Sequence, residues 1–146
     1  MYKRQVWAYT RDTGTNVWTQ LGDKLVGTGS IGDFVFQGTS VSMDSDATVA
    51  VVGGIQDNYF TGAVWVYTRE NAQGNWTQQG PKLSQSSNSR FGRSVGLSGD
   101  AKYLMVGAPQ EDAYLGATYA FGNAFFTSSP SSSPSISPSG APTIMK

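Results

Sequence analysis

Short apolar runs alternate with polar, glycine-rich segments along the first 126 residues of the chain. Three of the clearest apolar runs lie at 92–97, 102–108 and 116–121. In the last of them large and small side chains alternate, which places Tyr119 and Phe121 on one face of an extended segment. Glycines interrupt every apolar set that has helical spacing. The pattern therefore predicts an all-β fold of short strands and tight turns.

The sequence also repeats itself. Two pairs of segments match at a spacing of 58: 6–11 with 64–69, and 18–20 with 76–78. Two further pairs match at a spacing of 54: 40–41 with 94–95, and 52–53 with 106–107. A period near 55 suits one β-propeller blade of four antiparallel strands, with its loops.

On this spacing the first 126 residues divide into about two and a fraction blades. The prediction is a complete blade at about 38–79, the last two strands of another at 5–21, and the first three strands of a third at 92–126. So few blades cannot close a ring, and we expect an incomplete propeller. Open blade edges expose unpaired backbone groups, through which we expect the chain to associate.

Several recurring residues form a recognisable set. They are Phe91-Gly92, Leu97-Ser98-Gly99-Asp100, Val106-Gly107-Ala108-Pro109 and Gly116-Ala117. This set resembles the FG-GAP repeat, which builds the integrin-alpha type of β-propeller, usually with seven blades. The preceding unit is more degenerate, because Gln37-Gly38 stands in place of Phe-Gly.

The resemblance implies a non-enzymatic binding or adhesion module of a larger extracellular or cell-surface protein. Propellers of this kind present rim loops to protein or glycan ligands. Two alternatives remain open at this point. The chain would otherwise be a non-catalytic propeller part of a secreted hydrolase, or a truncated gene-model fragment without independent function.

The amino-acid composition excludes several kinds of catalytic and binding site. The chain contains no histidine and no cysteine, which excludes disulfides, thiolate nucleophiles and Ser-His or Cys-His catalytic arrangements. Ten Lys and Arg balance ten Asp and Glu, so the basic footprint of a nucleic-acid-binding protein is absent. We assign no catalytic residue and predict that the protein is not an enzyme.

The ends of the chain differ in composition from its body. Residues 127–146 are rich in Ser and Pro, and we expect a disordered tail. No apolar run follows the basic residues at the start, so we expect no signal peptide in this chain. The longest apolar run, 49–55, is too short for a membrane-spanning helix, and we expect no membrane span.

Four polar residues follow the Gly-Ala-Pro position in two matching loops: Asp57, Asn58, Glu111 and Asp112. Ligand contact on the propeller rim is one interpretation of these residues. Capping of the local turn is the other, and the residues favour it. Trp18 and Trp76 begin the predicted outer strand, where we expect exposed aromatic side chains.

Two further patterns admit a functional and a structural interpretation. Trp7, Tyr9, Trp65, Tyr67, Tyr119 and Phe121 form a recurring aromatic stripe. Packing between neighbouring sheets explains this stripe better than ring stacking with a ligand. Asp44 and Asp46 resemble a fragment of a calcium loop, but Ser98 replaces the first carboxylate in the next unit. We therefore predict a polar turn and no cofactor or metal site, with calcium as the alternative.

Overall fold

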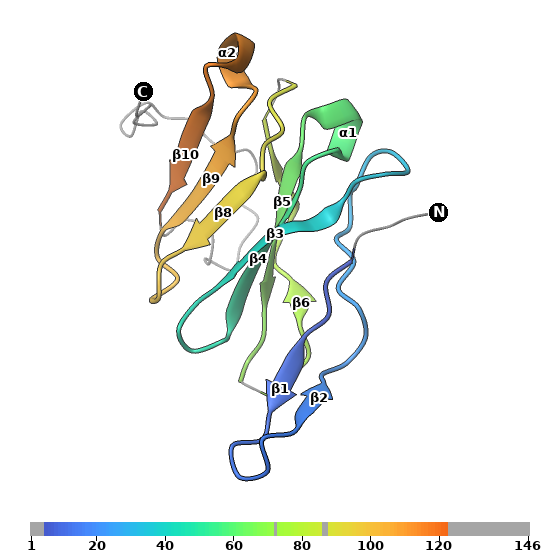
Figure 1. Ribbon diagram of the computed structural model, residues 1–146, viewed down its shortest axis with the longest axis vertical. Helices are drawn as coiled ribbons and strands as arrows, with labels where there is room; N and C mark the ends of the chain where they lie inside the picture. The colour runs from blue at the N-terminus through green and yellow to red at the C-terminus, as the bar shows by residue number, and fades with distance from the viewer. Residues whose placement is uncertain (1–4, 72, 86–87, 123–146) are drawn as a thin grey trace.

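A computed structural model describes residues 5–71, 73–85 and 88–122 of the chain. Within these residues, antiparallel strands form three open sheets (Figure 1). The expectation of an all-β fold is confirmed. The predicted Ser/Pro-rich tail at 127–146 lies outside the described residues.

The strands are short and follow one another along the chain. They are β1 (Tyr9–Arg11), β2 (Trp18–Gln20), β3 (Gln37–Met43), β4 (Val49–Gly54), β5 (Ala63–Thr68), β6 (Thr77–Gln78), β7 (Leu83–Ser84), β8 (Ser94–Leu97), β9 (Leu104–Ala108) and β10 (Ala117–Phe121). Two four-residue helical turns interrupt them, α1 (Asp57–Phe60) and α2 (Glu111–Tyr114). We name three units after the sheets: the N-terminal unit (5–25), the central unit (37–84) and the C-terminal unit (92–121).

The central unit is a meander in which β3, β4, β5 and β6 lie side by side. β5 reads Ala-Val-Trp-Val-Tyr-Thr, and its first five residues are buried on both faces of the sheet. An apolar run of this kind forms a central strand, because β-branched and aromatic side chains fill both layers beside it. β5 is therefore an inner strand of the central sheet, with side chains buried on both faces.

The outer edge of this sheet is split in two. β6 pairs with Tyr67 and Thr68 of β5, and β7 pairs with Ala63 and Val64. Pro81 lies between the two pieces and has no N–H with which to continue the ladder. The sheet thus runs to Ser84, beyond the predicted boundary at residue 79.

The strand pairs of the N-terminal unit have counterparts 58 positions later. Tyr9 pairs with Gln20 in β1–β2, as Tyr67 pairs with Gln78 in β5–β6. An isolated bridge joins Val6 to Leu25, the positions that correspond to the Val64–Leu83 pair of β5–β7. This unit therefore extends past the predicted end at residue 21.

The C-terminal unit has the registers of the central unit, displaced by 54 positions. Val95 pairs with Val106 in β8–β9, as Val41 pairs with Val52 in β3–β4. Tyr119 pairs with that same Val106 in β9–β10. The strand pairing of each unit is therefore set by its own local sequence.

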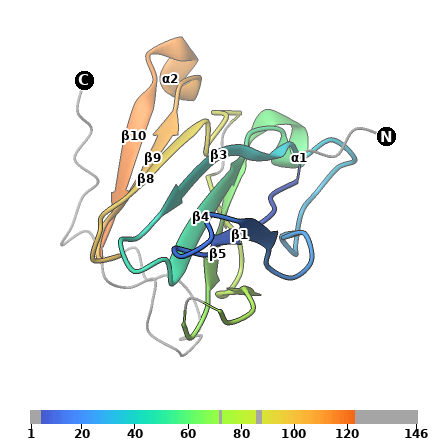
Figure 2. The same cartoon turned by 60° about the horizontal axis from the view of Figure 1, so that its bottom comes forward.

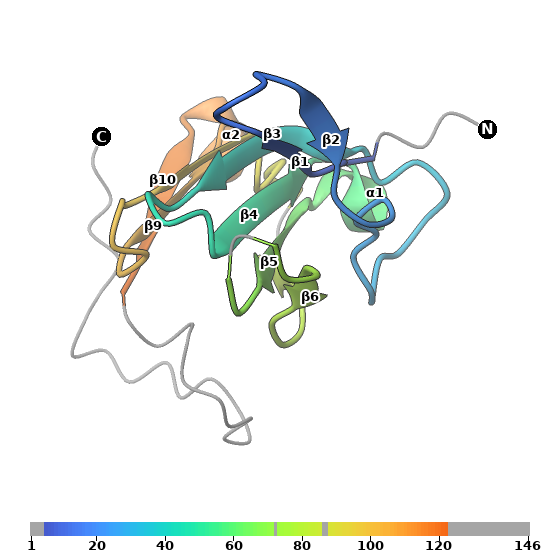
Figure 3. The same cartoon turned by 90° about the horizontal axis from the view of Figure 1, so that it is seen from below.

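The central sheet is covered on both faces. One face contributes Val49, Val51, Val64 and Val66 to a core shared with the C-terminal unit. The other contributes Val52, Ala63, Trp65 and Tyr67 to a core completed by Val6, Leu25 and Val35. Figures 2 and 3 show β9–β10 and β1–β2 on different sides of the central strands. The three units thus pack as successive layers.

Candidate functional site

The α1 and α2 turns are the feature that the sequence did not predict. Both lie at the same end of the molecule, above the strands in Figure 1. Their inner residues have left-handed backbones: φ is 48°, 54° and 70° at Asn58, Tyr59 and Phe60. Asp112, Ala113 and Tyr114 have matching φ values of 49°, 53° and 75°. Each non-glycine residue in this conformation costs roughly 1–2 kcal/mol, so the surrounding structure must hold both turns in place.

Backbone hydrogen bonds supply that support. The Gly62 N–H donates to the Asp57 carbonyl at 2.9 Å, and the Gly116 N–H donates to the Glu111 carbonyl at 3.0 Å. Both turns therefore close in the same way, on a glycine of positive φ. A glycine at that position supports the turn because it has no Cβ to resist a left-handed backbone.

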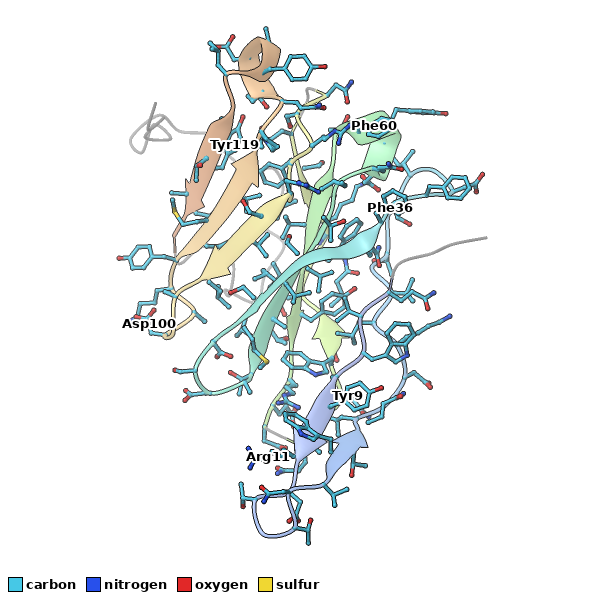
Figure 4. The ribbon with its side chains drawn as sticks, viewed as in Figure 1. Tyr9, Arg11, Phe36, Phe60, Asp100 and Tyr119 are labelled. Atoms are coloured by element: carbon cyan, nitrogen blue, oxygen red, sulfur yellow. The ribbon has the colours of Figure 1, made fainter. Side chains whose placement is uncertain are left out.

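Residues 88–91 lie between the two turns and bind both of them. The Arg90 N–H donates to the Phe60 carbonyl at 2.9 Å, and the Gln110 N–H donates to the Ser89 carbonyl at 3.1 Å. The Arg90 guanidinium also lies 5.1 Å from the centroid of the Phe60 ring. Figure 4 shows Phe60 in the α1 turn, at the end of the molecule away from Tyr9. The two turns are therefore parts of one ordered rim.

This rim exposes large side chains to solvent. Tyr59 is 83% exposed and Tyr114 is 76% exposed, with Leu115 beside it equally open. Asn58 and Asp112, two of the four predicted rim residues, are exposed as well. Aromatic rings with polar tips, together with amide and carboxylate oxygens, can both stack against a ligand and hydrogen-bond to it.

The other two predicted rim residues have different surroundings. Asp57 is fully buried, accepts a hydrogen bond from the Ile31 N–H at 2.8 Å, and forms an ion pair with Lys82. Each carboxylate oxygen has one of these partners, so Asp57 holds the α1 turn against the 26–36 loop and the residue before β7. Glu111 is half-buried and bonds to Tyr119, whose pKa is raised by burial and by the charge and hydrogen bond of Glu111.

The two candidate tryptophans also differ from each other. Trp18 is largely exposed, as predicted. Trp76 is half-buried against the core of Trp65 and Tyr67, and its ring lies 4.5 Å from the Arg69 guanidinium. The expectation that Trp76 is exposed is wrong, because the N-terminal unit covers the face of the sheet on which it lies.

The aromatic stripe is buried where a neighbouring unit covers it. Trp65 is inaccessible to solvent, and its indole N–H donates to the Thr28 carbonyl at 2.9 Å. Tyr119 and Phe121 pack edge-on against Phe91, with ring centroids 5.5 and 6.1 Å away. Burial raises the pKa of Tyr67 to about 12. These contacts support the packing interpretation of the stripe.

The Asp44 segment forms a polar turn. One Asp44 carboxylate oxygen accepts from the N–H groups of Thr48 and Val49 at 2.8 and 2.9 Å, and the other accepts from the Thr48 hydroxyl. Both oxygens are therefore engaged in holding the β3–β4 connection. An Asp so placed supplies the hydrogen-bond acceptors that such a turn needs.

In the corresponding turn of the C-terminal unit, two side chains accept the backbone hydrogen bonds instead of one. The Ser98 hydroxyl accepts from the Tyr103 N–H at 2.9 Å, and Asp100 accepts from the Lys102 N–H at 3.1 Å. Hydrogen bonds from the Ser98 hydroxyl and from Lys102 hold the pKa of Asp100 well below its usual range. The replacement of the first carboxylate by Ser98 thus keeps the turn intact.

Sequence reasoning missed the left-handed turns and the role of Lys82. A signal existed for both. Gly62 and Gly116 follow the acidic residues at the same distance, and Lys82 recurs 58 positions from Lys24. Neither pattern says which carboxylate a lysine reaches, because the partners lie 25 residues apart in the chain.

Among residues 5–71, 73–85 and 88–122, no group of three or more acidic side chains is placed to hold a metal ion. No helix in that part of the chain is both long and apolar enough to cross a membrane. No protein-family model matches the sequence, and no curated protein matches it significantly.

Proposed function

We propose that the protein is a non-enzymatic binding module whose ligand, a protein or a glycan, contacts the rim formed by α1 and α2. In this proposal the three units are propeller-type blades, and the module belongs to a larger extracellular or surface protein. The FG-GAP resemblance of Phe91-Gly92 and Gly107-Ala108-Pro109 supports that assignment.

One observation supports the binding site above all others. Two corresponding turns adopt the same unfavourable left-handed backbone and both expose a tyrosine at the same end of the molecule. Strained backbone tends to persist at ligand-binding segments, where a fixed geometry lowers the ordering cost of binding. Tyrosine adds contact area at low cost in side-chain entropy.

The proposal is tested by binding measurements on a glycan array and against candidate surface-protein ectodomains. We expect a hit for the wild-type chain and at least about a tenfold loss for Tyr59→Ala/Tyr114→Ala, the loss typical of an aromatic contact residue. Val41→Ala is the control, because Val41 is a similarly exposed side chain on β3 that belongs to no proposed contact surface. Equal loss in the control, or no loss in the rim variant, would contradict the proposed site.

A further inference from the structure

The N-terminal unit exposes an aromatic face that its counterpart in the central unit buries. Trp7 is 47% and Tyr9 is 55% exposed, whereas Trp65 and Tyr67, the corresponding residues, are 0% and 3% exposed. Trp18, exposed, and Trp76, half-buried, show the same contrast. We call Trp7, Tyr9 and Trp18 the aromatic face.

In the central and C-terminal units the residues that correspond to the aromatic face are covered by a neighbouring unit. Trp65 and Tyr67 pack on Val6, Leu25 and other residues that precede the central unit. One layer later, Tyr119 and Phe121 pack on the core that includes Val64 and Val66. In both cases the aromatic pair of one unit lies on the opposite face of the unit before it.

The backbone contacts at these two junctions correspond as well. A Cβ added to Gly38 would lie 3.0 Å from a Val6 methyl group. A Cβ added to Gly92, 54 residues on, would lie 3.0 Å from a methyl group of Val64. The same approach of glycine to valine thus occurs at both junctions between units.

The C-terminal unit exposes the complementary surface. Its outer face contains Tyr103, Met105, Thr118 and Ala120, which correspond to Val49, Val51, Val64 and Val66 of the central sheet. The four valines are buried, whereas Tyr103 and Ala120 are exposed and Met105 and Thr118 are half-buried. We call these four residues the outer face.

A hydroxyl group marks the same junction. The Ser40 hydroxyl donates to the Gly92 carbonyl of the following unit at 2.8 Å. Ser94 corresponds to Ser40 and lies exposed on the same side as the outer face. A further unit stacked there would offer Ser94 the acceptor that Ser40 already has.

We propose that the aromatic face of one copy of this chain binds the outer face of a second copy, head to tail. Two junctions inside the chain join these two kinds of face, and each end of the layered stack exposes one of them, so a second copy continues the stack. In this contact the large rings of the aromatic face pack on the small side chains of Thr118 and Ala120 in the outer face. Because the two surfaces differ, the contact is heterologous and can extend beyond a dimer.

The test measures the mass of the 146-residue chain by sedimentation velocity over a range of concentrations. We expect mass to rise with concentration in the wild type. Trp7→Glu/Trp18→Glu removes the aromatic face and Tyr103→Glu/Ala120→Glu blocks the outer face, and we expect each to weaken association at least about tenfold. All four side chains are exposed, so the fold should persist, as circular dichroism would verify.

Mixing the two variants gives the decisive result. Each retains one intact face, so we expect a mixture to form a dimer that neither variant forms alone and that does not extend further. Tyr59→Ala/Tyr114→Ala is the control and should associate like the wild type, which also separates this contact from rim binding. A monomeric wild type at all concentrations, unchanged association in either face variant, or a monomeric mixture would overturn the proposal.

Discussion

Segments 6–11 and 64–69 have nearly the same sequence and different surroundings. In the central unit this segment forms most of β5, which has a packed layer on each side. In the N-terminal unit Val6 packs against the central unit, whereas Trp7 and Tyr9 face solvent. The pairing with the following strand is the same in both, because Tyr9 pairs with Gln20 as Tyr67 pairs with Gln78. This pairing is therefore a local property, whereas the burial, and the further pairing of β5 with β4, are not.

This difference in burial indicates which side chains contribute most to the free energy of unfolding. Apolar area contributes only when it is removed from water, at roughly 25 cal/mol per Å². The same tryptophan therefore stabilises the molecule at position 65 and contributes little at position 7. Substitutions at corresponding positions of two units should therefore change stability by different amounts.

The largest expected effect comes from the two tryptophans. Trp65→Ala opens a cavity between the central sheet and the 26–36 loop, and it should cost about 3–5 kcal/mol of unfolding free energy. Trp7→Ala should cost about 1 kcal/mol or less. Urea unfolding followed by circular dichroism measures both. Equal losses would mean that Trp7 is buried in solution, and a Trp65→Phe variant covers the case in which Trp65→Ala does not fold.

The second comparison uses the matching lysines. Lys82→Met leaves the buried Asp57 carboxylate without its cation, and removal of one partner from such a pair costs about 3–5 kcal/mol. Lys24 is exposed, so Lys24→Met should change stability by about 0.5 kcal/mol at most. The same unfolding assay applies, and similar losses in the two variants would contradict the assigned ion pair.

The third comparison concerns the glycines that close the turns. Gly62 and Gly116 have φ values of 81° and 77°, so alanine is strained at both, by roughly 1–2 kcal/mol. A Cβ at Gly62 would also overlap the Phe91 backbone, whereas one at Gly116 would lie 3.5 Å from the nearest atom, the Pro109 carbonyl oxygen. Gly62→Ala should therefore lower the melting temperature more than Gly116→Ala. The reverse order would show that the 88–91 segment does not hold α1 in place.

The smallest expected effect is a shift with pH. Burial raises the pKa of Tyr67 to about 12, against about 10 in an unfolded chain. The unfolded state therefore loses this proton first, and stability that is fully present below pH 10 declines as the pH rises towards 12. Alkaline titration followed by tyrosinate absorbance should contain a late component that Tyr67→Phe reduces, and Tyr119 contributes the remainder because its pKa is raised too. Tyr9→Phe is the control, and loss of the late component there instead would reverse the burial assignment.

Local structure could be predicted because its causes are local. Strands and turns depend on residues a few positions apart, such as those around Asp44 and Ser98. Most strands therefore lie where the sequence pattern predicts them. The edge at β6 and β7 was predicted only in part, because the break at Pro81 depends on how far β5 extends beside it. The rim was predicted as a pair of loops, and two of its four residues, Asn58 and Asp112, are exposed.

The amino-acid sequence alone predicted the all-β fold, the positions of most strands and the equivalence of positions 58 and 54 residues apart. Side-chain alternation and turn hydrogen bonds depend on neighbouring residues, so similar segments form similar strands and turns in different units. Three features came instead from the packing of the units: Asp57 is buried on Lys82, α1 and α2 are left-handed, and Trp65 is covered while Trp7 is exposed. The burial of Asp57 and of Trp65 requires a segment distant in the chain that removes water from a surface. The two turns close on local hydrogen bonds but are held in place by residues 88–91, and no local pattern identifies these distant partners.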